Sequence, residues 1–476
     1  MAHHHTARHA IALIMQCEIS IKALGAGGDG IGKHDGVKVF VAGALPGERV
    51  RVDLGPLASG RYHAHLLERL SDSAARTIPP CKYFGICGGC VAQHIAHVPY
   101  VAWKLAGLTD ALAHRGLGDI TPAPLVSCPP ASRRRARFAL SYSVVKGKLG
   151  PALGFRQRGS SKVVDIAHCA ILLPELLTLL APLRHLVARI PGGVSEVSLT
   201  RAPVGCDVIL HGLTTLPDLI LREDLAAFIQ HHGIARLSVE SRAGGWQAAE
   251  NRSAKGGRRK SHGKNRKRGW SPERAGAGLL EVIAQPGAVQ AQYGTAAVAL
   301  PPGAFLQATA FGEAAIARQV LAGLELPGAR RAHVADLYAG IGGIGFGLAA
   351  EGHQVVMFEG DVAMAAAAAA AARAAGIRVS AEARDLARRP LSVAELKPFD
   401  AVIFDPPRSG ARAQAEMLAA SGVARVAAIS CNPASFARDA RILIDGGYRL
   451  STLTPIDQFL WSAHVELVAI FQREAG

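Results

Sequence analysis

The chain has 476 residues, more than a single hydrophobic core usually organises, so we expect two or three domains. Lysine and arginine outnumber aspartate and glutamate by 53 to 37, and the net charge of +16 favours a polyanionic partner, nucleic acid before an acidic membrane. No stretch offers the roughly 18 strongly apolar residues of a membrane span, and the first residues lack the long apolar region and cleavage site of a signal peptide, so we expect a cytoplasmic protein.

Residues 14–71 are expected to fold as a small β-barrel. The stretch "CEISIKALGAGGDGIGKHDGVKVFVAGALPGERVRVDL" alternates apolar and polar residues between glycine-rich turns and has no helical period. Short strands joined by close turns are typical of such a barrel.

Three cysteines follow in the glycine-rich stretch "CKYFGICGGC", and a fourth lies in "VVDIAHCAI". Eight cysteines in so long a chain do not indicate a disulfide framework, and clustered cysteines in a cytosolic protein more often bind metal or take part in chemistry. Four thiolates suit zinc or an iron–sulfur cluster, and the spacing alone does not separate the two. The expected metal ligands are Cys81, Cys87, Cys90 and Cys169.

Residues 72–300 are expected to form a mixed α+β domain. The pattern of apolar residues predicts a helix near 101–115 and strands near 137–145, 195–200 and 207–211. The first of these strands overlaps "SRRRARFAL", whose arginines we interpret as phosphate contacts, with a solvated edge strand as the alternative.

Within this domain, residues 251–274 contain ten lysines or arginines against one glutamate. The stretch has almost no aliphatic residues and cannot bury a core. Two interpretations stay open: a solvated linker, and a basic arm that contacts phosphates.

Residues 301–476 alternate hydrophobic strands with helices, which predicts a mostly parallel Rossmann-like sheet. The motif "DLYAGIGGIG" directly follows one strand, and its glycines would let the backbone approach a ligand closely. The next strand ends in Glu359, which can accept hydrogen bonds from a ribose diol. Together these features indicate an adenosine cofactor, S-adenosylmethionine ahead of NAD.

Two further strand ends carry candidate chemistry. "FDPPRSG" places Asp405 on a loop stiffened by two prolines. "ISCNPASF" places Cys431 where a buried strand meets an Asn-Pro turn, and this thiol could pack in the core, bind metal or act as a nucleophile. Four other cysteines already make a metal set, and the carboxyl end of a strand is the functional edge of such a sheet, so we favour the nucleophile. Glu466 in "SAHVELVAIF" is a candidate base, with pairing to an arginine as the alternative.

These motifs together closely resemble the RNA (uracil-5-)-methyltransferases, which use S-adenosylmethionine. "GERVRVDL" resembles the TRAM domain, "CKYFGICGGCVAQHI" the cysteine motif, and "PPGAFLQATAFGE", "DLYAGIGG", "FDPPRSG", "SCNPASFARD" and "DQFLWSAHVE" follow in the family's order. Because TRAM and cysteine motifs occur together, the chain is more similar to the 23S ribosomal RNA enzymes than to the tRNA type. The resemblance implies a 4Fe–4S cluster, with zinc as the lesser alternative.

The resemblance also implies roles for individual residues. The Cys431 thiolate would add to C6 of a uracil, C5 would take the methyl group, and Glu466 would remove the C5 proton before the thiolate leaves. The target uridine would be unpaired or flipped, because a stacked base cannot present C6 to a thiolate. The cofactor would contact Gln307, Tyr338, Gly340, Gly343, Glu359, Asp385 and Asp405.

We therefore expect a cytoplasmic, monomeric enzyme with 23S rRNA as its partner, no membrane contact and no protein partner. Two alternatives stay open. One keeps the chemistry and places the methyl group on tRNA. The other is a non-catalytic RNA-binding or ribosome assembly factor, which the intact Cys431 and Glu466 argue against.

Overall fold

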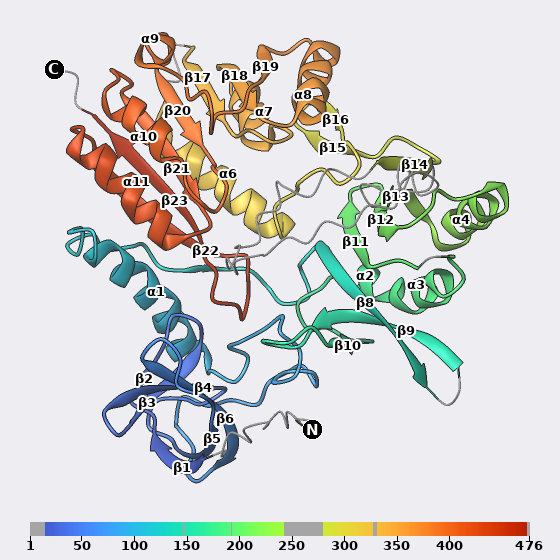
Figure 1. Cartoon of the computed structure of the whole chain (residues 1–476). Helices are drawn as coiled ribbons and strands as arrows, with labels where there is room; N and C mark the ends of the chain where they lie inside the picture. Colours follow the sequence, from blue (N-terminus) through green and yellow to red (C-terminus); the bar gives the residue numbers. More distant parts are fainter. Residues whose placement is uncertain (1–14, 146–147, 192, 242–278, 327–330, 474–476) are drawn as a thin grey trace, which may run out of the picture.

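The computed structural model describes residues 15–145, 148–191, 193–241, 279–326 and 331–473. The basic stretch 251–274 lies outside the described residues. Three parts are visible in Figure 1: a small N-terminal barrel, a central sheet with helices on one side, and a C-terminal sheet covered by helices.

The N-terminal part is a curled six-stranded sheet in the order β1-β5-β6-β4-β3-β2. Its inward-facing residues are mostly small or β-branched, and Val39, Val41, Val50 and Val52 are fully buried because they alternate along their strands. The sheet confirms the predicted barrel. Its strands are β1 (Met15–Ser20), β2 (Ala23–Leu24), β3 (Asp29–His34), β4 (Val37–Ala42), β5 (Arg49–Leu54) and β6 (Arg61–Arg69).

The central part is a seven-stranded sheet in the order β10-β9-β8-β11-β12-β13-β14. All three predicted strands are present, each with ends within a few residues of the prediction. The strands are β8 (Arg135–Val145), β9 (Lys148–Arg156), β10 (Val163–Asp165), β11 (Glu196–Ala202), β12 (Gly205–Leu213), β13 (Ile234–Ser241) and β14 (Leu280–Ala284). The accompanying helices are α2 (Pro174–Thr178), α3 (Leu180–Val187) and α4 (Leu219–His232).

The C-terminal part is an eight-stranded sheet in the order β19-β18-β17-β20-β21-β23-β22-β7. The pairs from β19 to β21 are parallel, whereas β23 runs antiparallel to both of its neighbours. The strands are β17 (His333–Leu337), β18 (Gln354–Glu359), β19 (Val379–Ala383), β20 (Ala401–Phe404), β21 (Arg425–Ser430), β22 (Arg449–Asp457) and β23 (Glu466–Gln472). This arrangement confirms the predicted Rossmann-like fold.

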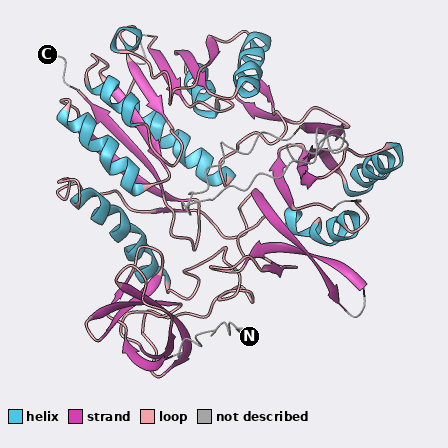
Figure 2. Cartoon of the chain, viewed as in Figure 1, coloured by secondary structure: helices cyan, strands magenta, loops and turns pink. Residues whose placement is uncertain are grey.

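Helices cover both faces of the C-terminal sheet (Figure 2). They are α6 (Ala310–Leu324), α7 (Gly343–Ala350), α8 (Val362–Ala375), α9 (Val393–Leu396), α10 (Arg412–Ala419) and α11 (Pro433–Asp445). A hairpin of β15 (Gln290–Tyr293) and β16 (Ala296–Ala299) leads into this region. Among the described residues, no helix combines the length and the apolar content that crossing a membrane would need.

One helix and one strand from the early part of the chain extend the C-terminal layer. Helix α1 (His97–Ala113) confirms the helix predicted near 101–115, although it begins four residues earlier. Its Leu108 and Leu112 are buried in the same core as Phe404 and Phe436. Strand β7 (Val126–Ser127) pairs with β22 at the sheet edge. Residues from the N-terminal half of the chain therefore pack directly against the C-terminal sheet. The domain boundary at residue 300 stays a prediction.

Candidate active site and cysteine cavity

A pocket of about 310 Å³ lies at the carboxyl ends of β17 and β20. The chain leaves β17 toward β18 and later returns to β20 on the other side, so this is the point where strand order reverses and ligands usually bind. Five of the seven residues predicted for the cofactor line it: Gln307, Tyr338, Gly340, Gly343 and Asp405.

The glycine-rich turn above β17 needs glycine for steric reasons. Gly340 and Gly342 have φ angles of +59° and +90°, which side chains disfavour. A Cβ at Gly342 would also lie 2.7 Å from Sδ of Met357. The backbone N–H of Gly340 donates to Oε2 of Glu359 at 2.7 Å, so this carboxylate fixes the turn that borders the pocket.

Asp385 lies close enough to Tyr338 for its negative charge to help raise the pKa of that hydroxyl, but it does not line the pocket. Its side chain is half exposed and accepts hydrogen bonds from the backbone N–H groups of Ala387 and Arg388. Asp385 and Glu359 are both absent from the pocket lining, and their direct contact with the cofactor stays a prediction.

Three lining residues were missed by sequence reasoning. Asp336 is only 3% exposed, and burial together with the nearby Asp405 and Glu359 raises its pKa to about 7. Tyr293 donates from its hydroxyl to Glu313 at 2.9 Å, and both line the same pocket. Asp336 could have been found as the acid that begins the glycine motif, but Tyr293 carries no sequence signal because it reaches the pocket from a separate hairpin.

Cys431 lies where β21 ends and α11 begins. Asn432 caps this helix by accepting from the backbone N–H of Ala434 at 3.1 Å, and its amide donates to the carbonyl of Arg408 at 3.0 Å. The Ser435 hydroxyl donates to the same carbonyl at 3.2 Å. The turn that presents Cys431 is therefore tied to the loop that presents Asp405.

Glu466 opens the neighbouring strand β23 and is 3% exposed. Burial and the negative charge of Asp405 raise its pKa well above the ordinary value. Burial, Glu466 and Asp405 likewise raise the pKa of Cys431 to about 11, while Arg408 acts in the opposite direction. The structure thus brings Cys431, Asp405 and Glu466 close enough to influence each other's ionisation.

Two glutamines connect the carboxylates of this site. Gln307 donates from Nε2 to Oδ2 of Asp405 at 3.3 Å, and its Oε1 accepts from Nε2 of Gln458 at 2.8 Å. The same Nε2 of Gln458 donates to Oε2 of Glu466 at 2.7 Å. Sequence reasoning passed over Gln458, although it stands in the motif "DQFLWSAHVE".

The arginines of "SRRRARFAL" contact protein, not only solvent. Arg134 donates to the carbonyl of Gln307 at 2.9 Å and to Glu313 at 2.6 Å. Arg135 donates to the carbonyl of Leu306 at 2.9 Å and lies over the ring of Phe305 at 4.4 Å. At least these two arginines position the loop that carries Gln307.

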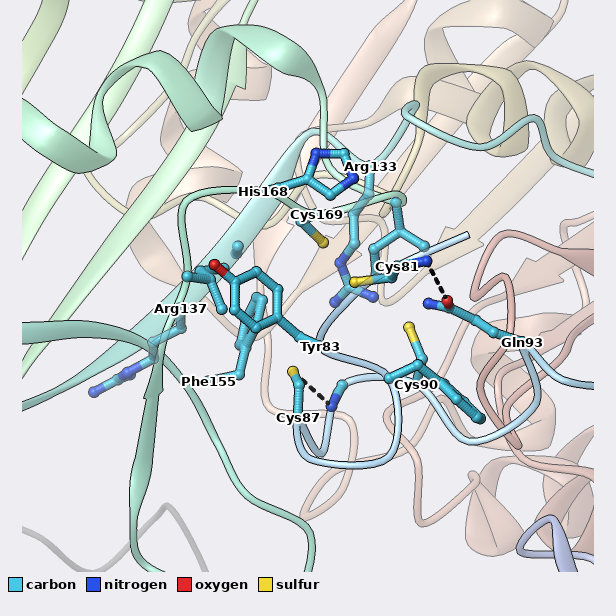
Figure 3. A pocket seen from close by; sticks show the side chains of 15 residues that line it. Cys81, Tyr83, Cys87, Cys90, Gln93, Arg133, Arg137, Phe155, His168 and Cys169 are labelled. Atoms are coloured by element: carbon cyan, nitrogen blue, oxygen red, sulfur yellow. Dashed lines mark hydrogen bonds between the residues drawn. The ribbon is translucent and has the colours of Figure 1, made fainter. Parts of the chain in front are cut away.

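A second cavity, of about 280 Å³, is lined by all four predicted metal ligands. Figure 3 shows the sulfur atoms of Cys81, Cys87, Cys90 and Cys169 turned toward one shared space. Burial raises the pKa of Cys87 and Cys169, and raises that of Cys90 to about 12. Such thiols ionise readily only when positive charge binds the sulfur.

The cavity does not contain a preformed metal site among the described residues. Among the described residues, no group of three or more histidine, cysteine or carboxylate side chains is arranged to hold a single metal ion. The side chain of Arg133 also lines the cavity (Figure 3).

The cysteine loop touches the segment that leads into Glu466. The backbone N–H groups of Val91 and Ala92 donate to the carbonyl of Trp461 at 2.8 and 3.1 Å. From α1, Lys104 binds Asp457 at 2.8 Å in a fully buried ion pair, and the Tyr100 hydroxyl donates to the same carboxylate. The segment between β22 and β23 is thus held from two sides.

Comparison with known proteins agrees with this geometry. The TRAM domain model matches residues 16–55, and the tRNA (Uracil-5-)-methyltransferase model matches residues 303–474. An uncharacterized RNA methyltransferase from Brucella suis is 39% identical over 96% of this chain and 98% of its own length. The 23S rRNA (uracil(1939)-C(5))-methyltransferase RlmD of Chromohalobacter salexigens is 34% identical over 96% of this chain and 89% of its own length.

A solved structure shares the whole architecture. The Pyrococcus abyssi tRNA (uracil-54, C5)-methyltransferase, crystallised with S-adenosyl-L-homocysteine, aligns over 96% of this chain and 100% of its own, with a TM-score of 0.67. Its sequence identity is 20%, so this likeness shows the fold alone. The two similar full-length sequences and the two family models confirm the expected resemblance: the chain belongs to the RNA (uracil-5-)-methyltransferase family and is an S-adenosylmethionine-dependent RNA methyltransferase.

Proposed function

We propose that this enzyme methylates C5 of a uridine in 23S rRNA through a covalent bond between Cys431 and C6. The observation that carries the proposal is the meeting of Cys431, Asp405 and Glu466 at one edge of the sheet, beside the pocket lined by Gln307 and Gly340. A nucleophile, a base and a methyl-donor pocket are the three parts that this reaction requires.

The proposed cycle starts with addition of the Cys431 thiolate to C6, which moves electron density to C5. C5 then attacks the methyl group of the sulfonium, and S-adenosylhomocysteine leaves with the bonding pair. Glu466 takes the C5 proton, the C5–H electrons form the C5=C6 double bond, and the C6–S bond breaks to return the thiolate. Burial raises the pKa of Glu466, which makes its carboxylate a stronger base toward the C5 proton.

The pocket suits a positively charged methyl donor. Asp336, Asp405 and Glu313 are carboxyl groups that line it, and a sulfonium would lower the cost of keeping them ionised. The sulfonium would also stabilise the thiolate form of Cys431, because its charge would offset the carboxylates of Glu466 and Asp405 that disfavour this form.

Cys81, Cys87, Cys90 and Cys169 would hold a 4Fe–4S cluster in this proposal. A single zinc ion needs sulfurs about 2.3 Å from one centre, whereas a cluster takes one thiolate on each of four irons. All four thiols line one cavity of about 280 Å³, which supports a cofactor held by four cysteines, and the family resemblance favours the cluster over zinc. Once bound, the cluster would cross-link the cysteine loop to the segment after β10.

The choice of 23S rRNA over tRNA rests on the relatives. The RlmD relative, named for 23S rRNA, aligns with nearly the whole chain, and the barrel and cysteine motif are both present. The family model over residues 303–474 carries a tRNA name, but it covers only the catalytic part.

The test uses S-adenosylmethionine labelled in its methyl group with unmodified 23S rRNA and unmodified tRNA in parallel. Label in 5-methyluridine of 23S rRNA is the expected result, and label only in tRNA would overturn the substrate assignment. Mapping 5-methyluridine in RNA from cells with and without the gene then identifies the position.

The cluster is tested separately by anaerobic purification. A brown protein with broad absorption near ~400 nm and about four irons per chain is expected. A colourless protein with one zinc would refute the cluster.

A further inference from the structure

Gln458 is buried at the catalytic edge and is hydrogen-bonded through both ends of its side-chain amide. It is 2% exposed and lies just beyond β22, opposite the start of β23 where Glu466 stands. Its Oε1 accepts from the backbone N–H of Ala308 at 3.0 Å. A backbone N–H can only donate, so the amide cannot be flipped and its Nε2 must face the other way.

The two hydrogens of Nε2 are both used. One goes to Oε1 of Gln307 at 2.8 Å and the other to Oε2 of Glu466 at 2.7 Å. The described part of the structure gives the Glu466 carboxylate no other hydrogen-bond donor. Oε2 therefore already accepts one hydrogen bond, whereas Oε1 has no donor among the described residues and is the oxygen more available to receive a proton.

Packing also fixes the side chain. A Cβ added at Gly312 would lie 2.9 Å from Cβ of Gln458 and 3.1 Å from its Oε1. Helix α6 can pack this closely against Gln458 only because residue 312 is glycine. The close packing prevents the Gln458 side chain from rotating away from Glu466.

We infer that Gln458 is a positioning residue for proton removal: it holds Glu466 through Oε2, presents Oε1 to the C5 proton, and through Gln307 ties this orientation to the methyl-donor pocket. The inference rests on the proposed function, because it assigns the partner of the proposed base. Gln458 itself exchanges no proton. It acts only after methyl transfer, in the step where the C5–H bond breaks and the Cys431–C6 bond is released.

The step can be isolated with RNA tritiated at uridine C5. Methyl transfer is followed by labelled methyl, proton removal by tritium release to water, and the intermediate by a denaturant-resistant protein–RNA complex. In Gln458→Met, which keeps the length and loses the hydrogen bonds, we expect tritium release to slow by about 10- to 100-fold, the range for losing a hydrogen bond to a charged group. A methylated covalent complex should accumulate, kcat should fall, and KM for RNA should stay within about twofold.

Gln319→Met is the matched control. The Gln319 side chain accepts a hydrogen bond of 3.2 Å from Thr454 in β22, the strand that Gln458 follows, and does not touch Glu466. Its substitution therefore removes a glutamine hydrogen bond to β22 and leaves the base unchanged. We expect no covalent complex and unchanged tritium release. Gly312→Ala keeps the Gln458 amide and crowds it, and should give a smaller accumulation than Gln458→Met.

The outcomes distinguish a failure of the role inferred for Gln458 from a failure of the proposed covalent mechanism. If methyl transfer and tritium release fall together in Gln458→Met, or neither changes, Gln458 does not position the base. Glu466→Gln serves as the reference: if it forms no methylated covalent complex, the proposed mechanism fails, whatever Gln458 does.

Discussion

At the catalytic edge, buried polar side chains form one connected series of hydrogen bonds, whereas in the cysteine cavity four thiols line a shared space and each bonds to its own neighbours. Asp405, Gln307, Gln458 and Glu466 form a continuous hydrogen-bonded series inside the protein. Of the cavity thiols, Cys87 accepts a long hydrogen bond of 3.4 Å from the backbone N–H of Gly89, Cys90 is hydrogen-bonded to the side chain of Gln93, and Cys169 accepts from the backbone of Ile171 and Leu172. The catalytic edge is therefore one connected network, whereas in the cysteine cavity burial disfavours the thiolate form of Cys87, Cys90 and Cys169, an effect that a bound metal would offset.

The two regions meet at the segment between β22 and β23. Backbone hydrogen bonds from the cysteine loop and the ion pair from α1 both end on it. We expect catalytic substitutions to affect activity without stability, cysteine substitutions to affect stability first, and substitutions at the junction to affect both.

The largest effect is expected for Cys431→Ala. Removal of a covalent nucleophile should lower the rate of methyl transfer by about 10⁴-fold or more. The thiol supports no ion pair, so the midpoint of thermal unfolding should stay within about 2 °C of the unmodified protein. Labelled-methyl transfer and calorimetry measure the two quantities. Substantial turnover by this variant would contradict the covalent mechanism.

Cys90→Ser should have the opposite effect to Cys431→Ala and lower stability first. Metal binding contributes directly to folding free energy, so losing one ligand should cost several kcal/mol and lower the metal content. Iron and zinc analysis with denaturant unfolding provide the readouts. Cys128→Ser is the control, because Cys128 is buried outside the cavity. Equal loss of stability in both variants, with metal unchanged, would mean that the cavity is ordinary core.

Lys104→Met tests the junction. Its partner Asp457 is fully buried, and leaving that carboxylate unpaired should cost about 3–5 kcal/mol. Arg412→Met, which removes an exposed ion pair with Glu416, should cost under about 1 kcal/mol. Urea unfolding compares the two. Methyl transfer should also fall in Lys104→Met, and full activity would show that the segment needs no anchor.

The smallest effect is a shift in the ionisation of Cys431. Because its pKa is raised to about 11, alkylation by iodoacetamide should speed up as the pH rises toward that value. An analogue with a positive charge in place of the sulfonium, such as sinefungin, should lower the pKa of Cys431 by about one unit, and S-adenosylhomocysteine, whose sulfur is neutral, should lower it less. Peptide mass spectrometry at several pH values follows the Cys431 peptide alone. The same pH dependence of Cys431 alkylation with both ligands would show that the charge of the methyl donor does not affect the ionisation of Cys431.

Sequence motifs predicted the groups that stand at strand ends. Asp405 and Cys431 each follow a buried strand, and parallel strands bring their carboxyl ends to one edge, so their meeting could be foreseen. Glu466 begins an antiparallel strand, and only the observed β21–β23 pairing explains how it reaches the same edge.

Contacts between distant segments could not be predicted. Gln458 depends on the register that sets Ile456 opposite Glu466 and on the closeness of Gly312, neither of which a motif encodes. The phosphate contacts expected for the arginines of "SRRRARFAL" stay a prediction. That Arg134 and Arg135 hold the Gln307 loop could not be foreseen, because an arginine looks the same in sequence whether it faces RNA or a carbonyl.

The central claim, covalent catalysis by Cys431 with Glu466 as the base, is tested most directly by Glu466→Gln. This variant is incubated with S-adenosylmethionine and 23S rRNA, digested with nuclease and protease, and analysed by mass spectrometry. The account predicts a peptide containing Cys431 that carries a methylated uridine. Continued turnover by Glu466→Gln, with no nucleotide on Cys431, would contradict it.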